Sequence, residues 1–177
     1  MKTFGFLFCA VCAMAAMAGE VPISDLDISK TKQGWKEAAR DFNLLGSRLS
    51  VAGKEYLAGM ATHSPSELYV KLNGATRFTA LVGVDDTCNY DGAKAVFQVI
   101  ADGRILWQSE PLKKGDAPVP VDVDISGRNT LLLRVDPWTD GNNGDHADWL
   151  EAKFITADAK KPEALKPQNW AALWVST

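Results

Sequence analysis

Cysteine and histidine are both scarce in this chain, which has three cysteines and two histidines in 177 residues. Cys9 and Cys12 lie in an N-terminal segment that we predict is removed, so only Cys88 remains. A single cysteine cannot form an intramolecular disulfide, and we expect Cys88 to be a small buried apolar side chain. Two histidines and one cysteine match no recognised zinc-ligand spacing, which disfavours a zinc site.

The chain also lacks a basic block and a long apolar run. Its formal net charge is −3, so nucleic acid and anionic membranes are not expected partners. The apolar run from Phe4 to Met14 is shorter than the roughly 20 residues of a membrane span. With Lys2 before it and a small-residue cleavage pattern after it, this run is typical of a signal peptide over residues 1–18. We therefore expect an exported protein, periplasmic or extracellular, that starts at Gly19.

Motifs for nucleophilic catalysis are missing. Ser64 follows His63 directly, but neighbouring residues in a strand or turn point apart, and no G-x-S-x-G motif is present. Nothing in the sequence orients Cys88 toward either histidine or indicates an oxyanion hole. The sequence therefore disfavours a serine or cysteine hydrolase.

Paired carboxylates leave one enzymatic alternative open. A small glycosidase would use Asp86 with Asp148 or Asp145, and it would need the two carboxyls at a defined separation across a sugar. A domain of this size with a filled core lacks the deep cleft that most glycosidases use. We expect no enzymatic activity.

From Glu67 onward apolar residues recur with period two, which predicts half-buried strands. The Val-Asp alternation over 121–125 is one example, and Asp102-Gly103 favours a tight hairpin. Turn residues at about ten-residue intervals favour an all-β fold, an antiparallel β-sandwich. One short helix is predicted over 34–43, where Trp35, Ala38, Ala39 and Phe42 share a face.

These patterns predict one domain over residues 19–156, followed by a linker-like tail over 157–177. Within the tail, Trp170 and Trp174 are four residues apart, as on one face of a short helix. We expect this tail to dock on its own domain. The alternative is a partner, either a glycoside hydrolase or another envelope protein.

The segment from Trp138 to Trp149 gathers amide, carboxylate, histidine and tryptophan side chains within twelve residues. Oxygen ligands in a Gly-rich loop suit a hard cation or sugar hydroxyls, and an exposed indole offers a face for a sugar ring. The segment is equally compatible with a polar loop whose tryptophans pack in the core. For calcium, the candidate ligands are Asp140, Asn142, Asp145 and Asp148. Asp25 would join them if the first and last strands of a jelly roll pair.

Five stretches resemble, in order, the motifs of the NPCBM family of carbohydrate-binding modules. They are Ile23–Leu26, Gly59–Ser66, Gly83–Asp86, Val96–Gly103 and Asp140–Trp149, within a match over Val21 to Ile155. The resemblance implies a galactose-binding-like β-sandwich, often a jelly roll with a structural calcium ion. It also implies a non-catalytic module that binds galactose-containing glycans beside a glycoside hydrolase. Ser64 stands where the family has alanine, Cys88 follows the Asp-Asp pair, and no hydrolase domain accompanies the module here.

We predict a site for glycan at one end of the sandwich, where the motifs containing His63, Asp86 and His146 meet loops. Trp138, at a strand exit after Pro137, is the predicted stacking platform. The predicted ligand-binding residues are His63, Asp86, Trp138, Asn142, Asn143 and His146. Trp149 and Trp107 are expected to pack inside the fold. A calcium-stabilised protein-interaction module of the cell envelope is the alternative to glycan binding.

Overall fold

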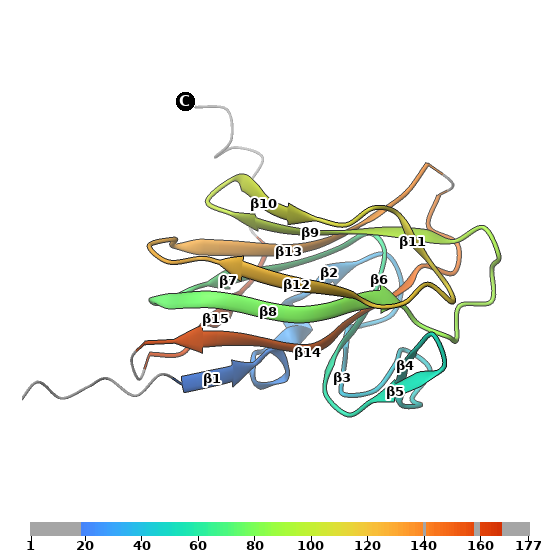
Figure 1. The fold of residues 1–177 in the computed structure, drawn as a ribbon, viewed down its shortest axis with the longest axis horizontal. Coiled ribbons are helices and arrows are strands. Elements are labelled where there is room, and N and C mark those ends of the chain that lie inside the picture. The colour runs from blue at the N-terminus through green and yellow to red at the C-terminus, as the bar shows by residue number, and fades with distance from the viewer. Residues whose placement is uncertain (1–18, 140, 158–159, 168–177) are drawn as a thin grey trace, which may run out of the picture.

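The chain is an antiparallel β-sandwich (Figure 1), as the strand period predicts. The structure is a computed structural model that describes residues 19–139, 141–157 and 160–167. The first sheet has the order β12 (Val119–Asp124), β8 (Ala75–Val84), β14 (His146–Thr156), β6 (Gly59–His63) and β3 (Ala39–Arg40), with β1 (Gly19–Pro22) also paired to β14. The predicted pairing of the first strand with the long closing strand is therefore present.

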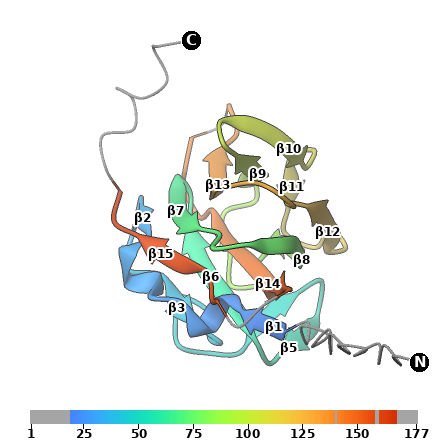
Figure 2. The same ribbon diagram turned by 90° about the vertical axis from the view of Figure 1, so that its left-hand side faces the viewer.

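The second sheet packs against the first (Figure 2). Its order is β10 (Arg104–Gln108), β9 (Lys94–Ala101), β13 (Thr130–Pro137), β7 (Ser66–Lys71) and β15 (Glu163–Leu165), with β11 (Leu112–Lys113) on β9 and β2 (Lys32–Gln33) on β7. A separate hairpin joins β4 (Leu49–Val51) to β5 (Lys54–Tyr56), and two 3-10 turns span Ile23–Asp25 and Ile28–Lys30.

Strand register follows the sequence pattern closely. On β12 the valines at 121 and 123 are buried, and the aspartates that follow each of them, at 122 and 124, are exposed. The more continuously apolar β13 lies between β7 and β9, inside its sheet. Asp102 and Gly103 both take positive φ, 43° and 82°, in the turn between β9 and β10. This is the backbone that the Asp-Gly pair favours.

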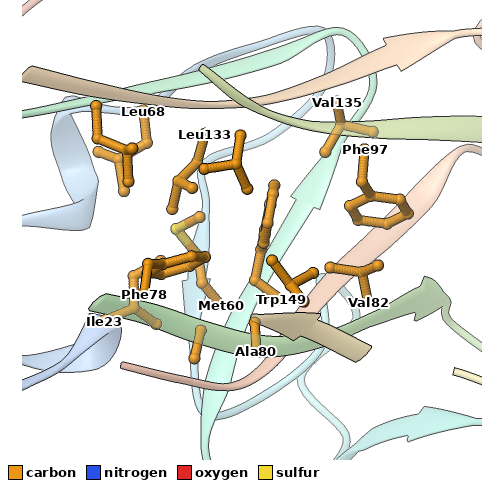
Figure 3. Packing of buried hydrophobic residues seen from close by; sticks show 14 of the residues in the cluster. Ile23, Met60, Leu68, Phe78, Ala80, Val82, Phe97, Leu133, Val135 and Trp149 are labelled. Carbon is orange, nitrogen blue, oxygen red and sulfur yellow. The ribbon is translucent and has the colours of Figure 1, made fainter. Parts of the chain in front are cut away.

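Trp149 lies at the centre of the core between the sheets (Figure 3). It is fully buried, and its ring meets Phe97 edge-on at 5.4 Å between centroids and Phe78 at 6.0 Å. Edge-to-face contacts add roughly 0.5–1.5 kcal/mol beyond the area that the rings bury. The predicted burial of Trp149 and Cys88 is confirmed, and Trp107 packs partly buried against the same core.

The predicted helix over 34–43 is wrong. That segment contains the short strand β3, and Lys36 and Asp41 have φ of 55° and 59°. Backbone pairing of Ala39 with Ala61 of β6 takes precedence over the weak helical pattern. None of the described residues forms a helix long and apolar enough to cross a membrane.

Part of the predicted tail belongs to the sandwich. Residues 163–165 form β15 on the edge of β7, with Ala164 in the core. Lys30 Nζ donates to the Ala164 carbonyl at 2.9 Å, and Asn73 Nδ2 donates to the Lys161 carbonyl at 2.9 Å. Trp170 and Trp174, like the predicted signal peptide, lie outside the described residues.

Candidate functional site

The motifs that contain the two histidines meet at one end of the sandwich, as predicted. His63 ends β6 and His146 begins β14, and the two residues are direct cross-strand partners. On the other side of β14, Ala147 pairs with Val84 at the end of β8. The loops that follow β8 and β13 extend from this same end, away from β1 (Figure 1). Antiparallel register alone therefore brings three distant motifs together.

A hollow of about 440 Å³ opens among these loops, and we call it the end hollow. Residues from five separate segments line it. They are Gly34, Trp35, Leu45, His63, Thr87, Asn89, Asn142, Asn143, Gly144 and His146. Its walls are mostly uncharged polar groups with one indole and one leucine.

Trp35 forms the aromatic wall of the end hollow. Its ring lies parallel to the His146 imidazole at 5.5 Å between centroids and edge-on to His63 at the same distance. The indole keeps 43% of its surface exposed. Gly34 allows this approach, because a Cβ there would lie 2.6 Å from the Ser64 carbonyl oxygen. Gly34 N–H donates to the His63 carbonyl at 3.3 Å, which ties the Trp35 segment to β6.

Leu45 reaches the hollow from a loop that Asn43 organises. The buried Asn43 side chain accepts from the backbone N–H groups of Leu45 and Ser47 and donates to the Arg48 carbonyl, each at 3.0 Å. Lys36 Nζ donates to the Leu44 carbonyl at 2.9 Å and lies over the Trp35 ring. These bonds join the Trp35 and Leu45 segments into one wall.

Hydrogen bonds fix the tautomer of both imidazoles. His63 Nδ1 lies 2.8 Å from the Ser64 carbonyl oxygen, which can only accept, so Nδ1 carries the proton. His146 Nδ1 lies 3.0 Å from Thr87 Oγ1, whose own proton goes to Asp85 in a short hydrogen bond. His146 Nδ1 therefore donates as well. Each neutral ring is left with Nε2 as a hydrogen-bond acceptor.

Burial keeps these imidazoles neutral. Desolvation lowers the pKa of His63 below its ordinary value of 6.5. Desolvation is also the main cause that lowers the pKa of His146. The charge of neighbouring His63 lowers it further, whereas the charge of Asp85 opposes the shift. Because both pKa values fall, the acceptor form of each ring dominates at neutral pH.

A buried acid pair lies behind the histidines. Asp85 accepts from the backbone N–H of Ser50 at 3.1 Å and of Thr87 at 2.8 Å, in addition to the Thr87 hydroxyl. Burial, then the charge of Asp85 and an acid–acid hydrogen bond with it, raises the pKa of Asp148 well above its usual range. When Asp148 is ionised, neither of its carboxylate oxygens has a hydrogen-bond donor. When Asp148 is protonated, it can donate a hydrogen bond to Asp85. These surroundings therefore disfavour the ionised form of Asp148.

The structure gathers four of the six predicted ligand-binding residues in the end hollow: His63, Asn142, Asn143 and His146. Asp86 and Trp138 lie elsewhere. The Asp86 carboxylate accepts from Ser50 Oγ and from Gly53 N–H, so it holds the β4–β5 hairpin. Trp138 lines a different hollow on the second sheet. Trp35, and not Trp138, is the tryptophan that lies beside the two histidines.

Trp35, Leu45, Thr87 and Asn89 were not predicted to line the site. The only sequence signal for Trp35 is the Gly-Trp step within a polar segment that has no strand period. That signal marks an irregular loop, but it does not indicate which end of the sandwich the loop covers.

The predicted calcium ligands lie in different surroundings. Asp145 and Asp148 are fully buried, whereas Asp25 is exposed in the first 3-10 turn. In the described part of the chain no three His, Cys, Asp or Glu side chains lie close enough to hold a metal ion. Calcium takes six to eight oxygen ligands, which can also include amide and backbone carbonyl oxygens. Asp140, the fourth predicted ligand, lies outside the described residues.

Comparison with known proteins agrees with the family resemblance. The model of the NPCBM/NEW2 domain family matches residues 19–155. Alpha-1,3-galactosidase B of Akkermansia muciniphila is 30% identical over 145 residues, which cover 79% of this chain and 18% of that protein. The chain thus spans less than a fifth of the length of this relative.

Solved binding modules share the fold. CBM51 from Clostridium perfringens GH95, in complex with methyl-galactose, is 28% identical with a TM-score of 0.71, over 77% of this chain and 99% of that one. CBM51-2 of Clostridium perfringens ZmpB, solved with its INT domains and GlcNAc, is 26% identical with a TM-score of 0.73, over 78% and 32% of the two chains. With its family-model match and its galactose-binding-like sandwich, the chain belongs to the NPCBM/NEW2 domain family of carbohydrate-binding modules.

Proposed function

We propose that this chain is an exported, non-catalytic module that binds galactose-containing glycans in the end hollow. The observation that carries this proposal is the pair of neutral imidazoles beside an exposed indole and two carboxamides. Neighbouring sugar hydroxyls need acceptors and donors spaced a few ångströms apart. The two Nε2 atoms accept, and Asn142 and Asn143 can both donate and accept.

The apolar part of a sugar ring has a partner as well. Trp35 and Leu45 supply the apolar wall, and an aromatic contact adds roughly 1 kcal/mol beyond the buried area. Hydroxyl contacts replace water contacts at small net gain. We therefore expect a dissociation constant between high micromolar and millimolar, about −4 to −6 kcal/mol. The related GH95 module in complex with methyl-galactose supports galactose as the first sugar to test.

The environment of the acidic residues supports a binding role without turnover. The described lining of the hollow includes no carboxyl group. Asp145 and Asp148, two of the candidate glycosidase acids, are fully buried, so neither can reach a glycosidic oxygen. Asp86 is committed to the β4–β5 hairpin. General acid catalysis needs a carboxyl within hydrogen-bonding reach of the leaving group, which these positions do not offer.

Export and partnership are proposed on other grounds. The signal-like pattern ends at residue 18, and the family match begins at residue 19. Mass spectrometry of the exported protein should find Gly19 at its N-terminus. Since its relatives include a named galactosidase many times longer, we propose that the module serves a glycoside hydrolase. Co-purification with such an enzyme from the native cells tests that part.

Calorimetric titration of the chain from Gly19 onward with methyl β-galactoside tests the binding site. Trp35→Ala should weaken binding at least tenfold because it removes the aromatic wall. Leu57→Ala is the matched control, since Leu57 is 73% exposed and does not line the hollow. A folded Trp35→Ala protein that binds as tightly as the parent would refute the site. A parent protein that binds no galactoside on a glycan array would refute the function.

The calcium ion predicted from sequence remains a proposal to be tested separately. If calcium stabilises the fold, EDTA should lower the melting temperature, and added calcium should restore it. The ligand set would then include residues outside the described ranges, such as Asp140.

A further inference from the structure

A second hollow, of about 500 Å³, lies on the outer face of the second sheet, and we call it the sheet hollow. It shares no lining residue with the end hollow. Its lining comes from three adjacent strands and the strand exit after β13: Val96, Gln98, Gln108, Arg134, Asp136, Pro137, Trp138 and Thr139.

Strand register builds this hollow. Gln98 of β9 pairs with Gln108 of β10 on one side and with Arg134 of β13 on the other, which gives one polar row across three strands. The next row on the same face contains Val96 opposite Asp136. The residues between these rows point into the core instead, as buried Phe97 and Val135 show (Figure 3).

The polar side chains are already paired and held in place. Gln98 Nε2 donates to Gln108 Oε1 at 2.6 Å, and Arg134 lies 2.7 Å from Asp136 and 4.0 Å from Glu67. Burial raises the pKa of Asp136 against the opposing charge of Arg134. Gln98 is nine-tenths buried, and its Oε1 lacks a donor among the described residues. The row therefore contains a buried acceptor that the fold leaves unsatisfied, which is uncommon.

Trp138 provides the aromatic side of this hollow. Its indole is 43% exposed, and its backbone N–H donates to the Lys94 carbonyl at 3.2 Å, which fixes the residue beside β9. Trp138 lines the hollow together with Pro137 and Val96. An apolar surface thus borders a row of amide, guanidinium and carboxyl groups.

We propose that the sheet hollow is a second carbohydrate subsite, which takes an uncharged pyranose unit. The choice of sugar as the ligand class rests on the function proposed above. An anion is disfavoured because Arg134 is already neutralised by Asp136 and Glu67. A purely apolar ligand is disfavoured because it would cover the polar row and leave Gln98 Oε1 without a donor. A pyranose offers both an apolar ring face for the indole and hydroxyls for the amide and ion-pair edges.

Two subsites on separate faces would let the module hold two chains, or two units of a branched glycan, at once. Each subsite is expected to be weak alone, whereas simultaneous contact with an immobilised glycan raises the apparent affinity without new contacts. A soluble disaccharide that occupies one subsite at a time would not show that gain.

Fluorine NMR on the chain from Gly19 onward, labelled with 5-fluorotryptophan, separates the two hollows. Trp→Phe variants assign the Trp35 and Trp138 resonances, and N-acetyllactosamine is added to about 50 mM, within the millimolar range expected for single subsites. We expect the Trp138 resonance to shift saturably in the parent and in a Trp35→Ala/His146→Ala variant. A Trp138 resonance that stays unmoved in both proteins overturns the second subsite, whatever Trp35 does. A moving Trp138 beside an unmoved Trp35 would instead overturn the end hollow alone.

Substitution of the polar row provides a second test. Gln108→Leu removes the amide and leaves an apolar side chain, so the sugar concentration at the midpoint of the Trp138 shift should rise at least fivefold while the Trp35 midpoint stays the same. Ile105→Ala is the matched control, because exposed Ile105 lies on the same strand without lining the hollow. Equal midpoints for Gln108→Leu and the parent would mean that the polar row does not contact the sugar.

Discussion

The end hollow and the sheet hollow are assembled in different ways. Five loop and strand-end segments, separated by up to about a hundred residues, meet around Trp35. Three neighbouring strands and one strand exit suffice around Trp138. The first depends on particular close contacts, such as the one at Gly34, whereas the second follows from backbone pairing with period two. We therefore expect the end hollow to be the more sensitive of the two to single substitutions and to pH.

We expect Gly34→Ala to cause the largest difference in sugar binding between the end hollow and the sheet hollow. An added Cβ would meet the Ser64 carbonyl at 2.6 Å and the Pro65 ring at 2.9 Å, both of which are held by the chain around them. The Trp35 segment must then move away from His63. Methyl β-galactoside binding in the end hollow should fall more than tenfold, as measured by calorimetry, at a strain cost of roughly 1–3 kcal/mol.

The control for that variant is Gly127→Ala. Gly127 has open space around it but a left-handed φ of 72°, so alanine there costs stability without reaching either hollow. Both variants should unfold at lower temperature than the parent, but only Gly34→Ala should lose binding. Retained binding in folded Gly34→Ala would show that the Trp35 wall does not contribute to the site.

The second-largest effect should come from acidification, which should weaken sugar binding in the end hollow. The pKa values of His63 and His146 are lowered, so their stabilising contribution is complete above about pH 6.5 and is lost as pH falls through the lowered values. Protonation also converts each Nε2 from an acceptor to a donor. Binding measured between pH 7.5 and 5 should fall about tenfold, if each lost acceptor costs roughly 0.5–1 kcal/mol.

The sheet hollow supplies the comparison for this pH series, since no histidine lines it. Its response, followed through the Trp138 fluorine resonance, should change less over the same range. If the affinity in the end hollow stayed constant down to a pH at which NMR shows both imidazoles protonated, the imidazoles would not contact the sugar.

A smaller effect is expected from Thr87→Val. Valine keeps the shape of threonine but removes the oxygen that accepts from His146 Nδ1. The imidazole can then change tautomer, and binding should fall about two- to tenfold, the range of one hydrogen bond. Thr87→Ser, which keeps the hydroxyl, should bind like the parent. Imidazole nitrogen NMR shifts that report the same tautomer in Thr87→Val and the parent would contradict this role.

The sequence predicts the strands and much of the site because both depend on local patterns. The period of two places β12 and β13 correctly, and the Asp-Gly step places the turn between β9 and β10. The antiparallel pairing of motif-bearing strand ends brings His63 to His146. These features need only neighbours in the chain or the regular geometry of a sheet.

The position of Trp35 needs more than local pattern. Its segment satisfies a weak helical period, but pairing of Ala39 with β6 and the close approach of Gly34 to Ser64 determine the backbone. Such contacts between irregular segments leave no period in the sequence. Trp138 was placed correctly at a strand exit, yet the direction in which β13 leaves its sheet decides which hollow it lines.

The smallest effect concerns the acid pair behind the end hollow. Because burial beside Asp85 raises the pKa of Asp148, its contribution to stability is complete below about pH 4 and is lost as pH rises through the raised value. Asp148→Asn has no proton to lose, so its stability relative to the parent should improve by about 1 kcal/mol between pH 5 and 8, measured by urea unfolding. Asp122→Asn is the control. Asp122 is exposed and Arg77 lowers its pKa, so the stability difference between this variant and the parent should stay constant over that range.

If Asp148→Asn were instead less stable than the parent by the same amount at both pH values, Asp148 would be ionised inside the protein. An ionised carboxylate without donors needs a cation beside it. That outcome would therefore favour the calcium site over the shared proton, provided that EDTA abolishes the stability difference between the variant and the parent.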